Sequence, residues 1–151
     1  CEEPSLNFRL PDILCALGIS QIKKLPNWVE KRAQLWSCYE SLIANSRVAK
    51  LVKKEAWCIP AWHLLPVQID FEELGNSRVN VFKFLNERNI FPQVHYQPVH
   101  CQPYWIERYG RDELPNAEGY FKKTMSLPLF VEMTEFNVQY VVETLMEAIK
   151  S

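Results

Sequence analysis

Apolar residues recur along this chain with the spacings of short amphipathic helices and brief strands. Four stretches are predicted to be helices, residues 12–25, 27–45, 77–89 and 134–150, and in the second and the last the apolar residues form one stripe. Asp12, Ser77 and Thr134 stand where three of these helices would begin, and each suits a helix start. Shorter helical segments are expected from Pro103 to Gly110 and from Asn116 to about Lys123.

Three short segments have the composition of strands: residues 62–70, a segment that begins near Gln93, and residues 125–129. Pro66 inside the first favours an edge position or a bulge. The connection from the second to the third is too short for a full crossover helix, which favours mixed or antiparallel pairing. We therefore predict an α/β fold of two layers, a small sheet with helices packed on it. Gly18, inside the first helix, predicts a close approach of neighbouring backbone.

Composition limits the possible functions. The 151 residues fit one domain, and a net charge of -1 offers no electrostatic footprint for nucleic acid or an anionic membrane. No apolar run has the length of a membrane span. Five scattered cysteines without a Cys-x-x-Cys pair indicate a reduced, cytoplasmic protein. Because the sequence starts at Cys1 without Met, we expect a piece of a longer protein.

The segment from Gln93 to Pro103 concentrates side chains that could contact a ligand. It holds two of the three histidines, on a backbone stiffened by Pro98 and Pro103. The alternative is an edge strand whose histidines are hydrogen-bonded and inactive. Composition and spacing alone leave both interpretations open.

Neither metal binding nor nucleophilic catalysis is favoured at this segment. Zinc held by His95, His100 and Cys101 would need another ligand, only His63 could add a nitrogen, and carboxylates nearby are scarce. Cys101 beside His100 is a weak nucleophile pair, because adjacent residues of an extended chain point to opposite faces. No Gly-rich phosphate loop is present. We expect no metal site.

Four sequence blocks, taken together, carry more information than any single motif. They are residues 7–25, which begin Asn-Phe-Arg-Leu-Pro-Asp, Ala-Trp-His-Leu-Leu-Pro-Val at 61–67, Gln-Val-His-Tyr-Gln-Pro-Val-His at 93–100, and Pro-Asn-Ala-Glu at 115–118 with Ser-Leu-Pro-Leu-Phe at 126–130. In order and spacing this pattern resembles the C-terminal part of the DegT/StrS family of sugar-nucleotide aminotransferases, which depend on pyridoxal phosphate (PLP) and have fold type I. The third and fourth blocks look most like the pseudaminic-acid branch of that family.

The resemblance implies a transaminase that moves an amino group from glutamate to the 4-keto carbon of a UDP-linked 4-keto-6-deoxy sugar, for surface-glycan biosynthesis. In such enzymes the lysine that binds PLP lies in a large N-terminal domain, and Lys23 and Lys24 do not match its motif. We therefore expect no catalytic residue in this chain, no PLP bound to it alone and no activity of the piece by itself. The family also implies a homodimer.

The resemblance further assigns binding residues. Asn7 matches the asparagine that reaches across the dimer towards the PLP phosphate and the substrate, with Phe8 where the family commonly has Tyr. Arg9 matches the neighbouring basic position, where an anion contact or an internal salt bridge is natural. The segment that lines the sugar-nucleotide site corresponds to Gln93, Val94, His95 and Tyr96. Trp62 and His63 are expected to pack.

The family's layout divides the chain in two. Residues 1–45 would form an N-terminal segment with bridging helices, and residues 46–151 the small α/β domain. Helices that lack their large domain would expose apolar faces, so we expect self-association. The competing hypothesis is a non-catalytic α/β module that binds a sugar nucleotide or another protein.

Overall fold

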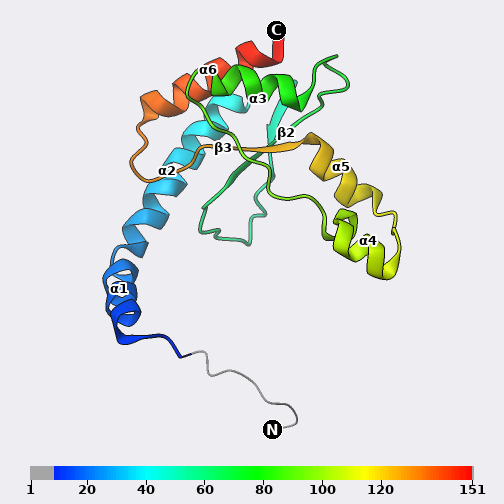
Figure 1. Ribbon diagram of the computed structural model, residues 1–151. Coiled ribbons are helices and arrows are strands. Elements are labelled where there is room, and N and C mark those ends of the chain that lie inside the picture. Colours follow the sequence, from blue (N-terminus) through cyan, green and yellow to red (C-terminus); the bar gives the residue numbers. More distant parts are fainter. Residues whose placement is uncertain (1–8, 151) are drawn as a thin grey trace.

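A computed structural model describes residues 9–150 of the chain. Its elements in order are α1 (Asp12–Ile22), α2 (Leu25–Ile43), β1 (Ala49–Leu51), β2 (Leu65–Ile69), α3 (Arg78–Asn86), the 3-10 turn η1 (Val99–Cys101), α4 (Pro103–Tyr109), α5 (Pro115–Lys123), β3 (Thr124–Leu127) and α6 (Glu135–Lys150). Figure 1 shows α1 extending from one end of the molecule and α4 with α5 from the other. The predicted α/β class, with a small sheet and helices packed on it, is confirmed.

Within residues 9–150 the sheet has three strands in the order β1-β2-β3, and both pairings are antiparallel. Along β2 the buried residues Leu65, Val67 and Ile69 alternate with two that are half-buried, so one face of the sheet meets the core. The expectation that Pro66 marks an edge strand or bulge is wrong, because β2 is central. The Pro66 carbonyl accepts a hydrogen bond from the amide of Val52, just beyond the end of β1. The missing N–H of Pro66 would also face this position beyond β1, so no hydrogen bond of the β1–β2 ladder is lost.

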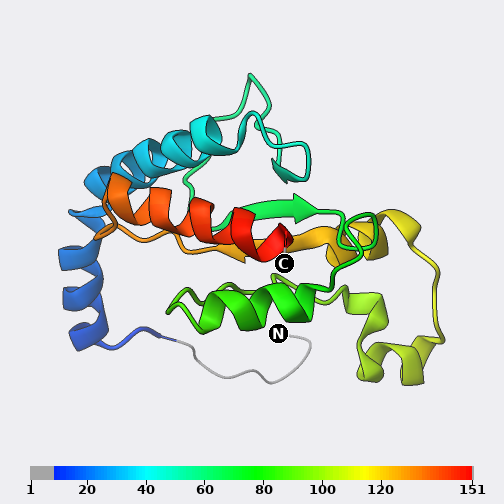
Figure 2. The same ribbon diagram turned by 90° about the horizontal axis from the view of Figure 1, so that it is seen from above.

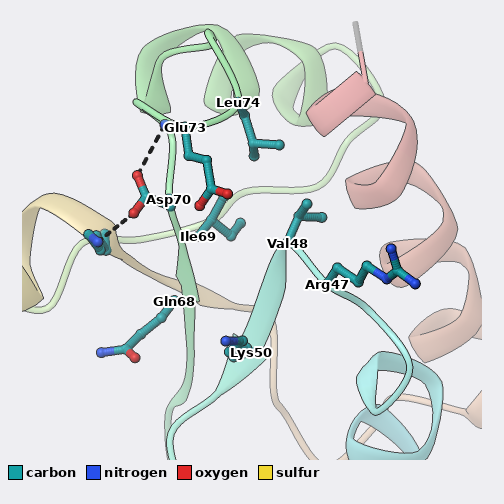
Figure 3. Close-up of a pocket in the computed structure, with 9 residues that line it drawn as sticks. Arg47, Val48, Lys50, Gln68, Ile69, Asp70, Glu73 and Leu74 are labelled. Atoms are coloured by element: carbon teal, nitrogen blue, oxygen red, sulfur yellow. Dashed lines mark hydrogen bonds and ion pairs between the residues drawn. The ribbon is translucent and has the colours of Figure 1, made fainter.

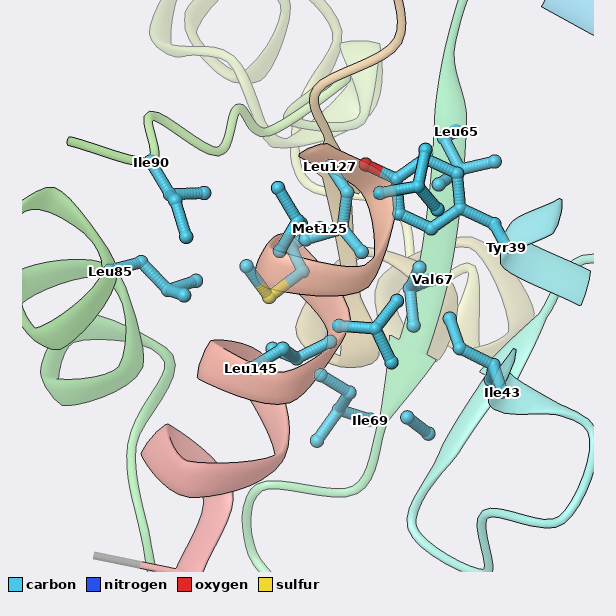
Figure 4. Packing of buried hydrophobic residues seen from close by; sticks show 14 of the residues in the cluster. Tyr39, Ile43, Leu65, Val67, Ile69, Leu85, Ile90, Met125, Leu127 and Leu145 are labelled. Atoms are coloured by element: carbon cyan, nitrogen blue, oxygen red, sulfur yellow. The ribbon is translucent and has the colours of Figure 1, made fainter. Parts of the chain in front are cut away.

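Helices α2, α3 and α6 cover the buried face. Seen from above, α6 lies between α2 and α3 and over the sheet (Figure 2). Figure 4 shows Tyr39, Val67 and Leu145 pointing into the space between α6 and the sheet. The predicted apolar stripe of the last helix is confirmed in its buried residues, Val138, Val141, Val142, Leu145 and Ile149. The predicted caps are also confirmed: Ser77 accepts from Asn80 N, and the Thr134 side chain accepts from Asn137 N.

Several predicted boundaries are wrong. The first strand covers only Leu65–Ile69, because Trp62 leaves the sheet and stacks on Trp36 with ring centroids 4.5 Å apart, the packing role expected for it. The strand β1 was not predicted. The helix expected from Asn116 begins at Pro115, and the last strand is Thr124–Leu127.

Helix α1 has no buried residue, although its length is largely apolar. Ile13 is 78% exposed and Ile22 is 65% exposed, so the helix presents apolar surface on more than one side. The close approach expected at Gly18 is wrong within residues 9–150, since nothing lies within 4 Å of a Cβ built there. Among the same residues, no helix combines the length and apolarity needed to cross a membrane.

Candidate substrate-binding segment

The segment that begins at Gln93 is held against the outer edge of β3. Gln93 N donates to Ser126 O at 3.0 Å, and Ser126 N donates to Gln93 O at 2.8 Å. This single antiparallel bridge stands where a strand was predicted, and the chain then turns into η1. The Gln93 side chain is exposed. Its backbone is therefore fixed while its amide remains available to a ligand.

His95 is oriented by the same serine. Its Nδ1 lies 2.9 Å from Ser126 Oγ, and Ser126 itself is buried. The neighbouring Tyr96 is 74% exposed, and its ring meets the imidazole edge-on at a centroid distance of 4.8 Å. With Nδ1 engaged, Nε2 is the ring nitrogen of His95 that can meet a ligand. Val94, between Gln93 and His95, is half-buried.

Of the other predicted binding residues, the structure describes only Arg9, which does not join this segment. Asn7 lies outside the described residues. Arg9 is exposed in the stretch that leads into α1. Figure 1 shows that stretch apart from the one between α3 and α4. Within residues 9–150, the structure brings together Gln93, His95 and Tyr96.

Sequence reasoning missed Ser126 as part of the site. In the sequence it is only a member of the Ser-Leu-Pro block, yet its backbone and its hydroxyl hold two residues of the segment. The available signal was its place next to the third strand, but the register that brings it to His95 comes from pairing across 31 positions of sequence. Such a pairing cannot be read from one strand alone.

An aromatic cluster follows the segment on α4. Tyr104 meets Trp105 edge-on at 5.3 Å, and Trp105 stacks on Tyr109 at 5.5 Å. All three side chains are exposed, and Arg108 donates to the Tyr104 hydroxyl at 3.1 Å. These rings form an exposed aromatic surface on α4.

A charged pocket lies elsewhere, between the β1–β2 edge and the end of α5 (Figure 3). Lys123 donates to the Asp70 carboxylate, which also accepts from Glu73 N at 3.2 Å. The hydrogen bond from Lys123 lowers the pKa of Asp70, and the same bond raises the pKa of Lys123. This ion pair ties α5 to the end of β2, and none of the lining residues belongs to Gln93–Tyr96.

The described residues do not fit a PLP site. The cofactor needs a lysine in an enclosed pocket, but every lysine in residues 9–150 is exposed except Lys31, which is half-buried on α2. A different set of ligating atoms does meet, at His100, Cys101 and Glu118. His100 Nε2 lies 3.3 Å from Glu118 Oε1, and this hydrogen bond lowers the pKa of Glu118.

Comparison with known proteins agrees with this architecture. The model of the DegT/DnrJ/EryC1/StrS aminotransferase family matches residues 2–146, and the chain belongs to that family. It is 31% identical to the spore coat polysaccharide biosynthesis protein SpsC of Bacillus subtilis, covering 99% of this chain and 39% of SpsC. It is 30% identical to the UDP-4-amino-4,6-dideoxy-N-acetyl-beta-L-altrosamine transaminase of Campylobacter jejuni, covering 98% of this chain and 39% of the relative.

The fold is shared with a solved enzyme. Helicobacter pylori PseC, an aminotransferase involved in the biosynthesis of pseudoaminic acid, superposes with a TM-score of 0.90 at 23% identity, over 99% of this chain and 40% of PseC. The chain thus spans about two fifths of the length of each of these proteins.

Proposed function

We propose that this chain is the C-terminal part of a PLP-dependent aminotransferase that acts on a nucleotide-linked 4-keto-6-deoxy sugar. In this proposal glutamate supplies the amino group, the sugar's 4-keto carbon receives it, and the product enters surface-glycan biosynthesis. The observation that carries the proposal is the family match over residues 2–146. The transaminase named in Campylobacter jejuni and the polysaccharide protein of Bacillus subtilis support the substrate class.

The geometry supports a role in substrate binding for Gln93–Tyr96. The exposed amide of Gln93 can both donate to and accept from a sugar hydroxyl. His95, with Nδ1 held by Ser126, presents Nε2 to a hydroxyl or to the diphosphate, and the exposed ring of Tyr96 offers a face to the sugar or base. Val94 lies between Gln93 and His95 and is half-buried.

The remaining assignments belong to the same proposal. Asn7 reaches the active site of a second subunit in a cytoplasmic homodimer, near the PLP phosphate and the substrate, and Arg9, at the neighbouring basic position, contacts the substrate. Residues 1–45 bridge towards the large domain, and residues 46–151 form the small domain. The exposed apolar surface of α1 supports that bridging role. PLP, bound by the large domain, supplies the electron sink for amino transfer.

The second candidate is a non-catalytic sugar-nucleotide-binding module. Both candidates are compatible with the absence of an enclosed lysine from residues 9–150, since the first places that lysine in the large domain. The two candidates share the binding segment and differ in whether the protein that contains this chain transfers an amino group.

One comparison of variants tests the role of the segment. His95→Ala, made in the full-length protein, removes one hydrogen bond to the substrate, and we expect kcat/KM with a UDP-linked 4-keto-6-deoxy sugar to fall about 10- to 100-fold. His63→Ala is the matched control, because His63 is exposed and lies outside the segment. Equal effects of the two variants would show that His95 does not contact the substrate. If the parent protein and both variants all fail to transfer an amino group, the result favours the binding module.

A further inference from the structure

We propose that His100, Cys101 and Glu118 bind a divalent cation of the zinc class, with a fourth position open to water. The three side chains offer one nitrogen, one sulfur and one carboxylate oxygen, and these atoms all lie within 4.8 Å of one another. His100 and Cys101 lie on η1, whereas Glu118 lies on α5. All three side chains are half-buried, so the group is neither freely solvated nor closed to an incoming ion.

The spacing is close to that of a tetrahedral zinc site. Zinc bonds of about 2.0–2.1 Å to nitrogen and oxygen place those two ligand atoms about 3.4 Å apart, and a bond of about 2.3 Å to sulfur makes the other edges about 3.6 Å. His100 Nε2 and Glu118 Oε1 are already 3.3 Å apart. The sulfur has to approach by no more than about 1.2 Å, a movement within the reach of a side-chain rotation.

The local backbone allows neighbouring residues to face one ion. On an extended chain His100 and Cys101 would point to opposite sides, but here they lie in a 3-10 turn. Cys101 N donates to Pro98 O at 2.9 Å, and the Gln97 amide donates to Cys101 O at 3.0 Å. These two bonds fix the turn that presents both side chains.

The ligand set differs from the one weighed in the sequence. That set combined His95 and His63 with His100 and Cys101, and it lacked a carboxylate. In the structure His95 is engaged with Ser126, and neither His95 nor His63 belongs to the converging group. Glu118 arrives from 18 residues further along, because α5 folds back against η1.

The chemistry of the group favours zinc over magnesium or calcium. Thiolate and imidazole are ligands that zinc accepts and that hard cations avoid. A neutral imidazole, a thiolate and a carboxylate together balance the charge of a divalent ion. Three protein ligands leave a coordination position for water. A bound ion would link η1 to α5, and η1 lies directly after the segment Gln93–Tyr96 along the chain.

Cobalt titration of the chelator-stripped chain tests the proposal. Co²⁺ is the probe because thiolate ligation gives a charge-transfer band in the near ultraviolet, and tetrahedral geometry gives intense visible bands. We expect both signals at one ion per chain, and their loss when one equivalent of Zn²⁺ is added. Cys101→Ser should abolish the charge-transfer band. Cys58→Ser should retain it, since Cys58 is also a half-buried free cysteine but lies outside the group.

Two further variants separate metal ligation from the hydrogen bond between His100 and Glu118. Glu118→Gln keeps the size of the side chain and a hydrogen-bonding group, and it should lower the affinity for zinc at least about 10-fold. His100→Ala should do the same, and circular dichroism on each variant checks that it is folded. The proposal is overturned if stripped protein gives no charge-transfer band, if Cys101→Ser matches Cys58→Ser, or if Glu118→Gln binds zinc as the parent does.

Discussion

Tyr39 provides a sharp test of how α2 packs on the sheet. Its side chain is completely buried between α2 and the sheet, and its hydroxyl donates to the carbonyl of Pro128 at 2.9 Å. Tyr39→Phe removes this hydrogen bond and leaves the ring in place. At neutral pH we expect the free energy of unfolding to fall by about 1 kcal/mol, the usual net contribution of one such bond.

The difference in the free energy of unfolding between the parent and Tyr39→Phe should change sign at high pH. Burial raises the pKa of Tyr39, so the folded state keeps the phenol neutral, whereas in the unfolded chain it ionises at about pH 10. The stability that Tyr39 contributes is therefore fully present below about pH 10 and is lost as the pH rises towards the raised folded-state pKa. At about pH 11 the ionisation of unfolded Tyr39 costs the parent about 1.4 kcal/mol, which exceeds the hydrogen bond.

Urea unfolding of the chain and of Tyr39→Phe, monitored by far-ultraviolet circular dichroism from about pH 8 to about pH 11, measures the difference. Other groups that titrate are common to both proteins and cancel in the comparison. We expect the parent to be the more stable at the lower end and the variant to equal or exceed it at the upper end. A constant difference across the range would refute the reasoning, because it would mean that Tyr39 is not buried as described.

Three further predictions concern the site, the core and α1. Ser126→Ala frees His95 Nδ1, so kcat/KM of the full-length protein should fall about 3- to 10-fold, whereas Ser126→Ala added to His95→Ala should cause little further loss; additive losses would show that the two residues act separately. Leu145→Ala should lower the free energy of unfolding by about 2–5 kcal/mol. Phe136→Ala, at a side chain that is 75% exposed on the same helix, should change it by less than about 0.5 kcal/mol. Comparable losses in the two variants would show that Leu145 is not part of the core. Light scattering should show self-association of the chain that Ile13→Glu reduces, since Ile13 is 78% exposed; a parent that stays monomeric over a wide concentration range would contradict this.

The sequence predicted the helices well because their apolar residues repeat with the helical period. The stripe on α6 runs from Val138 to Ile149, and its periodicity could be seen without any knowledge of the sheet. The caps at Ser77 and Thr134 are local interactions between residues three positions apart, and they were found for the same reason.

The strands were less predictable because pairing, not composition, defines them. The strand β1 has three residues, one of which is the exposed Lys50, and it exists through its register with β2. The segment at Gln93 has strand-like composition but meets β3 through one bridge only. The chain then enters the proline-bounded turn at η1, and the pairing with β3 therefore does not continue beyond this bridge.

The candidate site stays a prediction. The resemblance of the Gln93–Tyr96 block to the family pointed to this segment, but neither periodicity nor spacing could place its side chains. The contacts that shape it, His95 with Ser126 and His100 with Glu118, join residues 31 and 18 positions apart. Both depend on how α5 and β3 return past the segment, which is a property of the tertiary fold.

The most direct test of the central claim traces nitrogen from the donor to the sugar. The full-length protein is incubated with ¹⁵N-glutamate and a UDP-linked 4-keto-6-deoxy sugar, and the product is examined by nuclear magnetic resonance and mass spectrometry. Our account predicts a ¹⁵N-amine at carbon 4 of the sugar and an equal amount of 2-oxoglutarate. A protein that binds the sugar nucleotide but leaves all of the label in glutamate would contradict it.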